Sequence, residues 1–311
     1  MAHYDTKVVS SLFFYSPLLK QAMEMDPTER VNYMTTFPSS SPLTTRRETF
    51  ADGLTIRFGE RENNGRPMLI LHGGGGPQTV AGLAAGLAKA HVIVPTHPGF
   101  AGEPRPEWFD SIDDLAFVYL DLLERLNLHE VLVIGSSMGG WIASAMALHD
   151  TARRLGGLVL INAAGIRVEG YPVVDVSTLT PDELSALSFH NPAPFRVDPA
   201  TVTPEQIEGR KANARALATY DQGLGSGDPK LSRRLRRVNI PVLVVWGESD
   251  RVILPEYGRA YAKSFPNARF ELIPEAGHLP QIEQPERLLP LVRQFALSIR
   301  TTPTAGSFKE R

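Results

Sequence analysis

The sequence predicts an α/β fold in which a mostly parallel central sheet is flanked by helices and interrupted once by a helical insertion. Two observations predict it. Short apolar runs rich in β-branched residues alternate with helical stretches over residues 49–164, and this alternation returns after residue 239. Between these parts, in residues 165–238, the alternation stops and seven of the 25 prolines occur. Short apolar strands that alternate with helices are typical of a parallel sheet covered on both faces.

The expected elements follow in chain order. Strands are expected at residues 68–71, 92–94, 131–134, 158–161, 242–246 and 270–273. Helices of the core are expected around residues 79–89, 112–126, 138–148, 256–265 and 286–299. Helices of the insertion are expected around residues 182–187, 204–220 and 230–237, the first of them opened by Pro181 and two carboxylates. Proline and acidic residues both favour the first turn of a helix.

These elements divide the chain into four parts. They are an N-terminal extension without an obvious strand (1–48), an α/β core (49–164 and 239–300), a helical cap (165–238) and a flexible tail (301–311). The cap follows one strand and precedes another, so it should lie over the carboxyl edge of the sheet, where open α/β proteins bind ligands. The extension holds apolar residues that packing over the cap or a homodimer contact would bury, and the sequence does not choose between the two.

Composition excludes several classes of function. The chain has 311 residues, a formal net charge of -2 and no cysteine. The lack of cysteine excludes disulfides, cysteine-ligated zinc, iron–sulfur clusters and a thiol nucleophile. The balanced charge argues against a nucleic-acid-binding domain, which is usually strongly basic. No apolar run is long enough to cross a bilayer and the first residues lack a signal-peptide pattern, so we expect a cytoplasmic protein without a membrane span.

The most informative motif is Gly-x-Ser-x-Gly, formed by Gly135, Ser137 and Gly139. It follows an apolar strand and opens a helix, and Ser137, not Ser136, stands between the two glycines. A sharp strand-to-helix turn of this kind exposes the serine and points backbone N–H groups of the new helix at its oxygen. Five-residue patterns also arise by chance, but the strand and helix on either side favour a functional serine.

A glycine-rich loop, His72 to Pro77, follows the first expected strand. Its bare amides suit an oxyanion hole, in which one of them joins the N–H of Met138. A phosphate-binding loop is the alternative, but no Gly-Lys-Ser/Thr follows and the third glycine of Gly-x-Gly-x-x-Gly is missing. For His72 we expect a structural role in shaping the loop.

A nucleophilic serine needs a base and an acid that orients the base. His278 lies just beyond the last expected strand, and Asp250 follows the penultimate strand, with Glu248 as the fallback acid. An isolated aspartate after a strand is more often a turn or a helix cap. Serine, acid and histidine in this chain order, each after a strand, make coincidence much less plausible. His97 follows another strand at the same edge and is expected to line the site.

These motifs together resemble those of the α/β-hydrolase superfamily over residues 49–299. One departure is Ala101, which follows Phe100 where relatives usually place glycine, and it affects a loop only. The resemblance implies an α/β-hydrolase fold in which residues 165–238 are the family's helical cap. It implies a catalytic triad of nucleophile Ser137, general base His278 and acid Asp250, and an oxyanion hole built from the amides of Met138 and Gly74, with Gly73 as neighbour.

The resemblance also separates branches of the superfamily. Ser137 excludes the haloalkane dehalogenases and epoxide hydrolases, which carry an aspartate there. The glycine loop resembles that of carbon–carbon hydrolases of ring-cleavage products, but those enzymes tend to have tryptophan where this chain has Leu279. It also resembles the loop of proline iminopeptidases, whose cap supplies acidic residues for a substrate amine. Helix starts account equally well for the acidic residues of this cap, namely Asp182, Glu183, Glu205 and Glu208.

The expected function is that of a carboxylesterase-like serine hydrolase without cofactor or metal. It would cleave an ester-type bond of a small, fairly apolar substrate through an acyl-enzyme. Three alternatives stay open: a carbon–carbon bond hydrolase, a hydrolase-like ligand receptor, and perhydrolysis as a side activity. Trp108 and Phe189 are candidates for lining the substrate pocket, although aromatic residues in a cap more often serve in packing.

Overall fold

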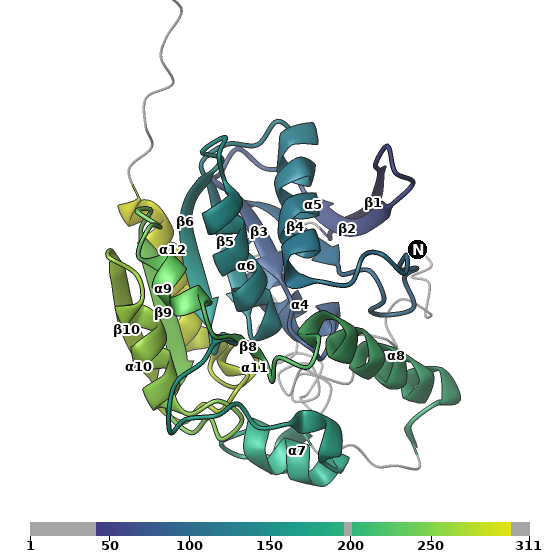
Figure 1. Ribbon diagram of the computed structural model, residues 1–311, viewed down its shortest axis with the longest axis vertical. Coiled ribbons are helices and arrows are strands. Elements are labelled where there is room, and N and C mark those ends of the chain that lie inside the picture. The colour runs from purple at the N-terminus through teal and green to yellow at the C-terminus, as the bar shows by residue number, and fades with distance from the viewer. Residues whose placement is uncertain (1–41, 196–200, 300–311) are drawn as a thin grey trace, which may run out of the picture.

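The computed structural model describes residues 42–195 and 201–299, which form a twisted sheet with helices on both faces (Figure 1). The eight strands of the main sheet lie in the order β1-β2-β4-β3-β5-β6-β9-β10. β1 and β2 pair antiparallel, β2 pairs antiparallel with β4, and all other neighbours are parallel. The strands are β1 (Thr44–Thr49), β2 (Thr55–Arg61), β3 (Pro67–Leu71), β4 (His91–Thr96), β5 (Val131–Ser136), β6 (Leu155–Ile161), β9 (Val242–Gly247) and β10 (Ala268–Ile273).

All six expected strands are present, and the prediction of a mostly parallel sheet is confirmed. The expectation that residues 1–48 carry no strand is wrong at their end, because β1 begins at Thr44. β1 is polar and mostly exposed, and β2 alternates buried with half-buried side chains, so neither forms a continuous apolar run. An antiparallel pair at a sheet edge needs only one apolar face. The expectations for residues 1–41 and for the tail fall outside the described residues.

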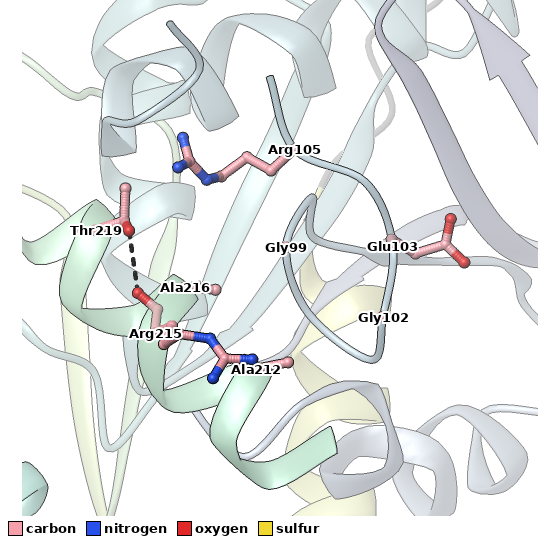
Figure 2. Close-up of a pocket in the computed structure, with 8 residues that line it drawn as sticks. All are labelled: Gly99, Gly102, Glu103, Arg105, Ala212, Arg215, Ala216 and Thr219. Carbon is pink, nitrogen blue, oxygen red and sulfur yellow. Dashed lines mark hydrogen bonds between the residues drawn. The ribbon is translucent and has the colours of Figure 1, made fainter. Parts of the chain in front are cut away.

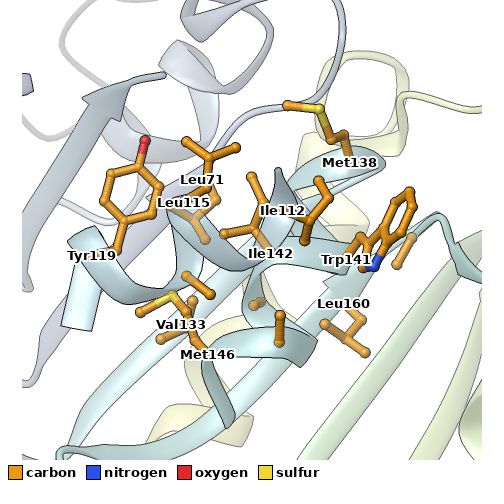
Figure 3. Packing of buried hydrophobic residues seen from close by; sticks show 14 of the residues in the cluster. Leu71, Ile112, Leu115, Tyr119, Val133, Met138, Trp141, Ile142, Met146 and Leu160 are labelled. Atoms are coloured by element: carbon orange, nitrogen blue, oxygen red, sulfur yellow. The ribbon is translucent and has the colours of Figure 1, made fainter. Parts of the chain in front are cut away.

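Helices cover both faces of the sheet (Figure 1). Side chains of α5, α6 and α10 belong to the larger apolar cluster, and those of α4 and α12 belong to the second cluster on the other face. Figure 3 shows α5 and α6 packing onto β3, β5 and β6 through residues such as Leu71, Ile142 and Leu160. The core helices are α4 (Ala81–Gly86), preceded by the 3₁₀ helix η1 (Pro77–Val80), then α5 (Ile112–Arg125), α6 (Met138–His149), α10 (Pro255–Lys263), α11 (Pro280–Glu283) and α12 (Pro285–Ser298).

The segment between β6 and β9 contains the helices expected for residues 165–238, and we use the name cap for this segment. α7 and α8 both start with a threonine cap, a proline in the first turn and a capping box, each cap being worth about 1 kcal/mol. β7 and β8 pair in parallel and join the two ends of the insertion. In Figure 1, α7 and α8 are both drawn toward the lower end of the sheet, with α8 at the right. The elements are β7 (Gly165–Ile166), η2 (Val176–Thr178), α7 (Pro181–Ser188), η3 (Ala193–Phe195), α8 (Pro204–Asp221), β8 (Gly227–Asp228) and α9 (Leu231–Leu235).

Within the part of the chain that the structure describes, no helix is both long enough and apolar enough to cross a membrane.

Candidate active site

Ser137 occupies the turn between β5 and α6. Its backbone has φ 54° and ψ -119°, a combination that residues with a side chain rarely adopt. The turn leaves Ser137 half-buried while its neighbours Ser136 and Met138 are buried. The predicted order of strand, serine turn and helix is therefore confirmed, and the strained backbone presents the serine hydroxyl at the carboxyl edge of the sheet.

The glycines of the motif allow this turn to pack. A Cβ atom on Gly135 would clash with the carbonyl oxygen of Gly139, and a Cβ on Gly139 would clash with that of Leu71. Both clashes involve backbone, which cannot move aside as a side chain can. The prediction that Gly135 and Gly139 permit a close approach of strand and helix is confirmed.

A chain of hydrogen bonds links Ser137, His278 and Asp250, and we call it the Ser–His–Asp chain. His278 Nε2 lies 3.1 Å from Ser137 Oγ, and His278 Nδ1 lies 2.9 Å from Asp250 Oδ2. His278 follows β10 and Asp250 follows β9, so three loops at one edge of the sheet supply the three groups. A carboxylate on Nδ1 favours the tautomer that carries its proton there, which leaves Nε2 free to accept the serine proton. The fallback acid, Glu248, is exposed and forms no part of this chain.

The carboxylate of Asp250 is fully buried and held on both oxygens. Oδ1 accepts hydrogen bonds from the backbone N–H groups of Val252 and Ile253 at 2.9 and 3.0 Å. Oδ2 accepts a hydrogen bond from Asn162 Nδ2 at 2.6 Å, in addition to the one from His278 Nδ1. Asn162 was missed by the sequence reasoning, although it directly follows β6 and obeys the rule that singled out Asp250. Its φ of 45° is one that asparagine tolerates better than most residues.

The glycine loop lies against Ser137 on one side and the cap on the other. A Cβ on Gly73 would come within 2.8 Å of Ser137 Cβ, so Gly73 touches the serine directly. A Cβ on Gly74 would come within 2.8 Å of Leu217 Cδ2 on α8. Met138 is the first residue of α6, where backbone N–H groups lack partners within the helix. The structure thus brings the three residues expected at the oxyanion hole to the same region as Ser137.

A model of the alpha/beta hydrolase family matches residues 68–291, which is more than half of the 311 residues. The chain belongs to the alpha/beta hydrolase family. The matched range includes Ser137, Asp250 and His278. The predicted α/β-hydrolase fold is confirmed by this match together with the parallel sheet and its covering helices.

Several similar proteins are hydrolases. The chain is 29% identical over 259 residues to Lipase 3 of Moraxella sp., covering 79% of this chain and 82% of that protein. It is 26% identical over 264 residues to the 2-hydroxy-6-oxononadienedioate/2-hydroxy-6-oxononatrienedioate hydrolase of Paraburkholderia phymatum, covering 78% and 91%. A solved esterase structure from Thermogutta terrifontis superposes with a TM-score of 0.64 at 26% identity, covering 84% of this chain and 99% of that chain. These relatives support hydrolase activity, while their names differ in substrate.

In this α/β hydrolase, the loop that carries His278 is bonded to the cap. The N–H of His278 donates to the carbonyl oxygen of Ser188 at 2.6 Å, and the N–H of Gly277 donates to Glu283 Oε2 at 2.6 Å. The Glu283 carboxylate also accepts from the N–H groups of His190 at 2.9 Å and Asn191 at 3.2 Å. Glu283 therefore connects the loop of the histidine with the segment that follows α7. No pattern in the sequence pointed to it.

Arg251 makes a second connection between the hydrolase core and α7. Its backbone N–H donates to Leu187 O at 3.2 Å, and its Nη2 donates to Phe189 O at 2.8 Å and to Ala186 O. The last carbonyl groups of a helix have no partners within the helix and carry partial negative charge, so a guanidinium group stabilises them. The residue next to Asp250 thus holds the carboxyl end of α7.

Two further histidines, His72 and His97, hold the glycine loop in place through hydrogen bonds. His72 Nδ1 donates to Gly73 O at 2.8 Å, and His72 Nε2 accepts from the N–H of His97 at 3.2 Å. His97 Nε2 donates to His72 O at 3.0 Å, and its Nδ1 accepts from the Tyr119 hydroxyl at 2.5 Å. The expected structural role of His72 in shaping the loop is confirmed by these bonds.

Burial keeps both of these histidines neutral. Desolvation lowers the pKa of His97 from 6.5 to about 4, although the hydrogen bond to His72 opposes the shift. Desolvation and the neighbouring His97 lower the pKa of His72 well below its ordinary value. Neutral imidazoles are what the two networks require, since one ring nitrogen of each accepts a hydrogen bond.

The candidates for the substrate pocket fall in three different environments. His97 is fully buried with both ring nitrogens occupied, so the expectation that it lines the site is wrong. Trp108 is 55% exposed and packs edge-on against Phe109, and no hydrogen bond or ring contact joins it to the Ser–His–Asp chain. Phe189 is buried, stacks on Phe195 at 4.2 Å and directly follows Ser188, whose carbonyl binds His278. Phe189 alone among the three stands next to that chain.

Within residues 42–195 and 201–299, no three histidine, aspartate or glutamate side chains are grouped so that they could hold a metal ion.

Proposed function

We propose that this α/β hydrolase cleaves an ester bond of a small, fairly apolar substrate through an acyl-enzyme on Ser137. The observation that carries the proposal is the Ser–His–Asp chain, with contacts of 3.1 and 2.9 Å at the edge of the sheet. A serine hydroxyl becomes a competent nucleophile when a neighbouring base takes its proton. The similarity to a lipase and to an esterase favours an ester as the bond that is cleaved.

The reaction would proceed in two halves. Ser137 Oγ attacks the ester carbonyl carbon while His278 Nε2 takes the hydroxyl proton, and His278 then returns this proton to the departing alcohol. Water attacks the resulting acyl-enzyme and gives its own proton to His278. Collapse of the second tetrahedral intermediate releases the acid and restores the Ser137 hydroxyl. Asp250 holds the imidazole in the required tautomer and stabilises its positive form.

The oxyanion would be stabilised by the N–H groups of Met138 and Gly74, with Gly73 between Gly74 and the serine. The Gly73 carbonyl accepts hydrogen bonds from His72 Nδ1 at 2.8 Å and from the Gly76 N–H at 3.1 Å. The C=O and N–H of a trans peptide unit point in opposite directions. The bonds to the Gly73 carbonyl therefore turn the Gly74 N–H the other way, out of the loop. In many acyl-transfer enzymes, preorganised donors of this kind make the largest single contribution to stabilising the transition state.

Hydrolysis of a carbon–carbon bond is the second candidate. It is supported by the 26% identity to a 2-hydroxy-6-oxononadienedioate hydrolase and by the glycine loop. Leu279 after the histidine counts against it. The two candidates differ in measurable terms, because they predict turnover of different substrates by the same serine. Parallel assays with short-chain aryl esters and with a vinylogous 1,5-diketone acid will separate them.

The nucleophile can be tested directly. We expect a fluorophosphonate to label Ser137 and the Ser137→Ala variant to lose labelling, with kcat/KM for aryl esters falling by about 10⁴-fold or more. Ser136→Ala is the matched control, because the Ser136 hydroxyl is buried and accepts a hydrogen bond from Gln281 at 3.1 Å. This variant should still be labelled at Ser137. Labelling at another residue, or full activity of Ser137→Ala, would refute the proposal.

A further inference from the structure

A pocket separate from the Ser–His–Asp chain lies between α8 of the cap and the loop that follows β4. Its volume is about 380 Å³, near the lower end of the roughly 300–1,000 Å³ of small-molecule sites. None of its lining residues belongs to the Ser–His–Asp chain or to the glycine loop. Gly99, Gly102, Glu103 and Arg105 line it from the loop, and Ala212, Arg215, Ala216 and Thr219 line it from α8 (Figure 2).

Small residues create this hollow. Gly99 and Gly102 both have positive φ, 85° and 78°, which turns the loop back on itself. A Cβ on Gly99 would come within 3.1 Å of Ala216 Cβ, so the loop rests on α8 at that point. A Cβ on Gly102 would meet nothing within 4 Å, so Gly102 borders open space. Contact at Gly99 and a gap at Gly102 leave a pocket that is bounded by both elements.

Glu103, the acidic residue that lines the pocket, forms its ion pairs with arginines outside the pocket. Figure 2 shows the Glu103 side chain pointing away from α8. Its carboxylate binds Arg57 Nε at 2.6 Å and Arg47 Nη1 at 3.0 Å. Two cations therefore balance this one negative charge on the far side of the loop, and Glu103 adds no net negative charge to the pocket.

The other charged groups that line the pocket are two guanidinium groups, Arg105 on the loop and Arg215 on α8. Arg105 Nη1 donates to the carbonyl oxygens of Pro106 and Phe109, both at 2.9 Å, which fixes the half-buried side chain in place. Arg215 is exposed on α8. Among residues 42–195 and 201–299, no carboxylate oxygen lies within 4.0 Å of either guanidinium. Glu208, on the same helix as Arg215, pairs with Lys211 at 2.8 Å.

We propose that this pocket binds a small dicarboxylate, held by Arg105 on the core side and by Arg215 on the cap side. Guanidinium groups form charge-assisted and often bidentate hydrogen bonds with carboxylates. Gly102 has no side chain and Ala212 and Ala216 carry only a methyl group, so the pocket has room for the short carbon skeleton between the two acid groups. A bound dianion would bridge the cap and the core, because its two partners belong to different elements.

Titration of succinate into the intact protein at constant ionic strength, followed by calorimetry, tests the proposal. We expect saturable one-to-one binding that Arg215→Gln weakens by about tenfold or more, as loss of a charged hydrogen bond implies. Arg210→Gln is the matched control, since Arg210 is exposed on the same helix and does not line the pocket. Absence of saturable binding, or equal weakening by both substitutions, would overturn the proposal.

Three further measurements test the location of the site and the class of its ligand. Ala212→Leu fills the pocket without changing its charge and is expected to abolish succinate binding while the circular dichroism spectrum is unchanged. Unaltered binding by this variant would overturn the location. Protein with a fluorophosphonate on Ser137 should still bind succinate, and loss of binding would assign the anion to the surroundings of Ser137 instead. Tighter binding of inorganic phosphate than of succinate would overturn the ligand class.

Discussion

At the carboxyl edge of the sheet, the single histidine His278 and the pair His72 and His97 differ in their hydrogen-bond partners. His278 has a carboxylate, Asp250, on its Nδ1, whereas His72 and His97 bind only carbonyl, backbone N–H and hydroxyl groups. In the described part of the chain, neither member of the pair lies within 4.0 Å of a carboxylate oxygen. The partner therefore decides what a buried imidazole at this edge can do. A carboxylate stabilises the imidazolium that proton transfer creates, and without one the ring stays neutral and supports a loop.

The largest effect is expected when His278 loses its carboxylate partner. Asp250→Asn keeps the size of the acid but withdraws the charge that His278 needs, so kcat/KM for an aryl ester should fall by about 10⁴-fold. The hydrogen bonds from Val252 and Ile253 can still form, so the melting temperature should change much less. Steady-state kinetics and thermal unfolding check both statements. Activity within tenfold of the original would remove Asp250 from the proposed mechanism.

The next effect concerns stability in acid. The pKa of His97 is about 4 in the folded chain and 6.5 when unfolded, so the unfolded state binds the proton more tightly. The contribution of neutral His97 to the free energy of unfolding is therefore fully present above about pH 6.5. It is lost as the pH falls toward 4, and the loss from this group amounts to about 3 kcal/mol. The lowered pKa of His72 acts in the same direction. Urea unfolding at several pH values measures the slope, which should become shallower in His97→Phe. An unchanged slope would contradict the assignment.

The smallest effect is expected from a substitution of His97, and it distinguishes a structural role of this residue from a catalytic one. His97→Phe leaves the Tyr119 hydroxyl and the His72 carbonyl without partners, which should lower the free energy of unfolding by about 2 kcal/mol. The glycine loop would be held less firmly, and kcat/KM is expected to fall by about tenfold. Because the pair does not exchange protons with substrate, the pH profile of kcat/KM should keep its shape. A loss as large as that of Asp250→Asn would give His97 a direct catalytic role.

The sequence predicts the fold to the extent that each element is buried. The runs at 131–134 and 242–246 are continuous apolar segments because parallel strands are covered on both faces. Thr55–Arg61 was missed because one face of β2 is only half-buried, although its alternation of polar and apolar residues was a readable signal. β1 is almost entirely exposed, so only pairing with β2 identifies it.

The candidate site divides in a similar way. Ser137, Asp250 and His278 could be predicted because each lies on the loop or turn that follows a strand, and the topology brings such positions together at one edge. His97 satisfies the same rule but is fully buried by Tyr119 and Phe100, which only tertiary packing determines. Glu283 lies on a single turn of helix, and its partners are the N–H of Gly277 and the backbone N–H groups of the distant segment that follows α7. No local pattern encodes contacts of that kind.

The bonds that Arg251 and Glu283 make to the end of α7 and the residues after it tie this part of the cap to the proposed catalytic base. Moving residues 186–191 away from the core would break these bonds together with the one between the His278 N–H and Ser188 O. It would also displace the proposed base. α8 is also bonded to the core, since Asn213 Nδ2 donates to Gly75 O at 3.1 Å, Asn213 Oδ1 accepts from the Ala101 N–H at 2.9 Å and the Tyr220 hydroxyl donates to Pro98 O at 2.8 Å. The end of α7 and the proposed base are therefore coupled, because the same short segment bonds to the loop of His278 and to both core side chains.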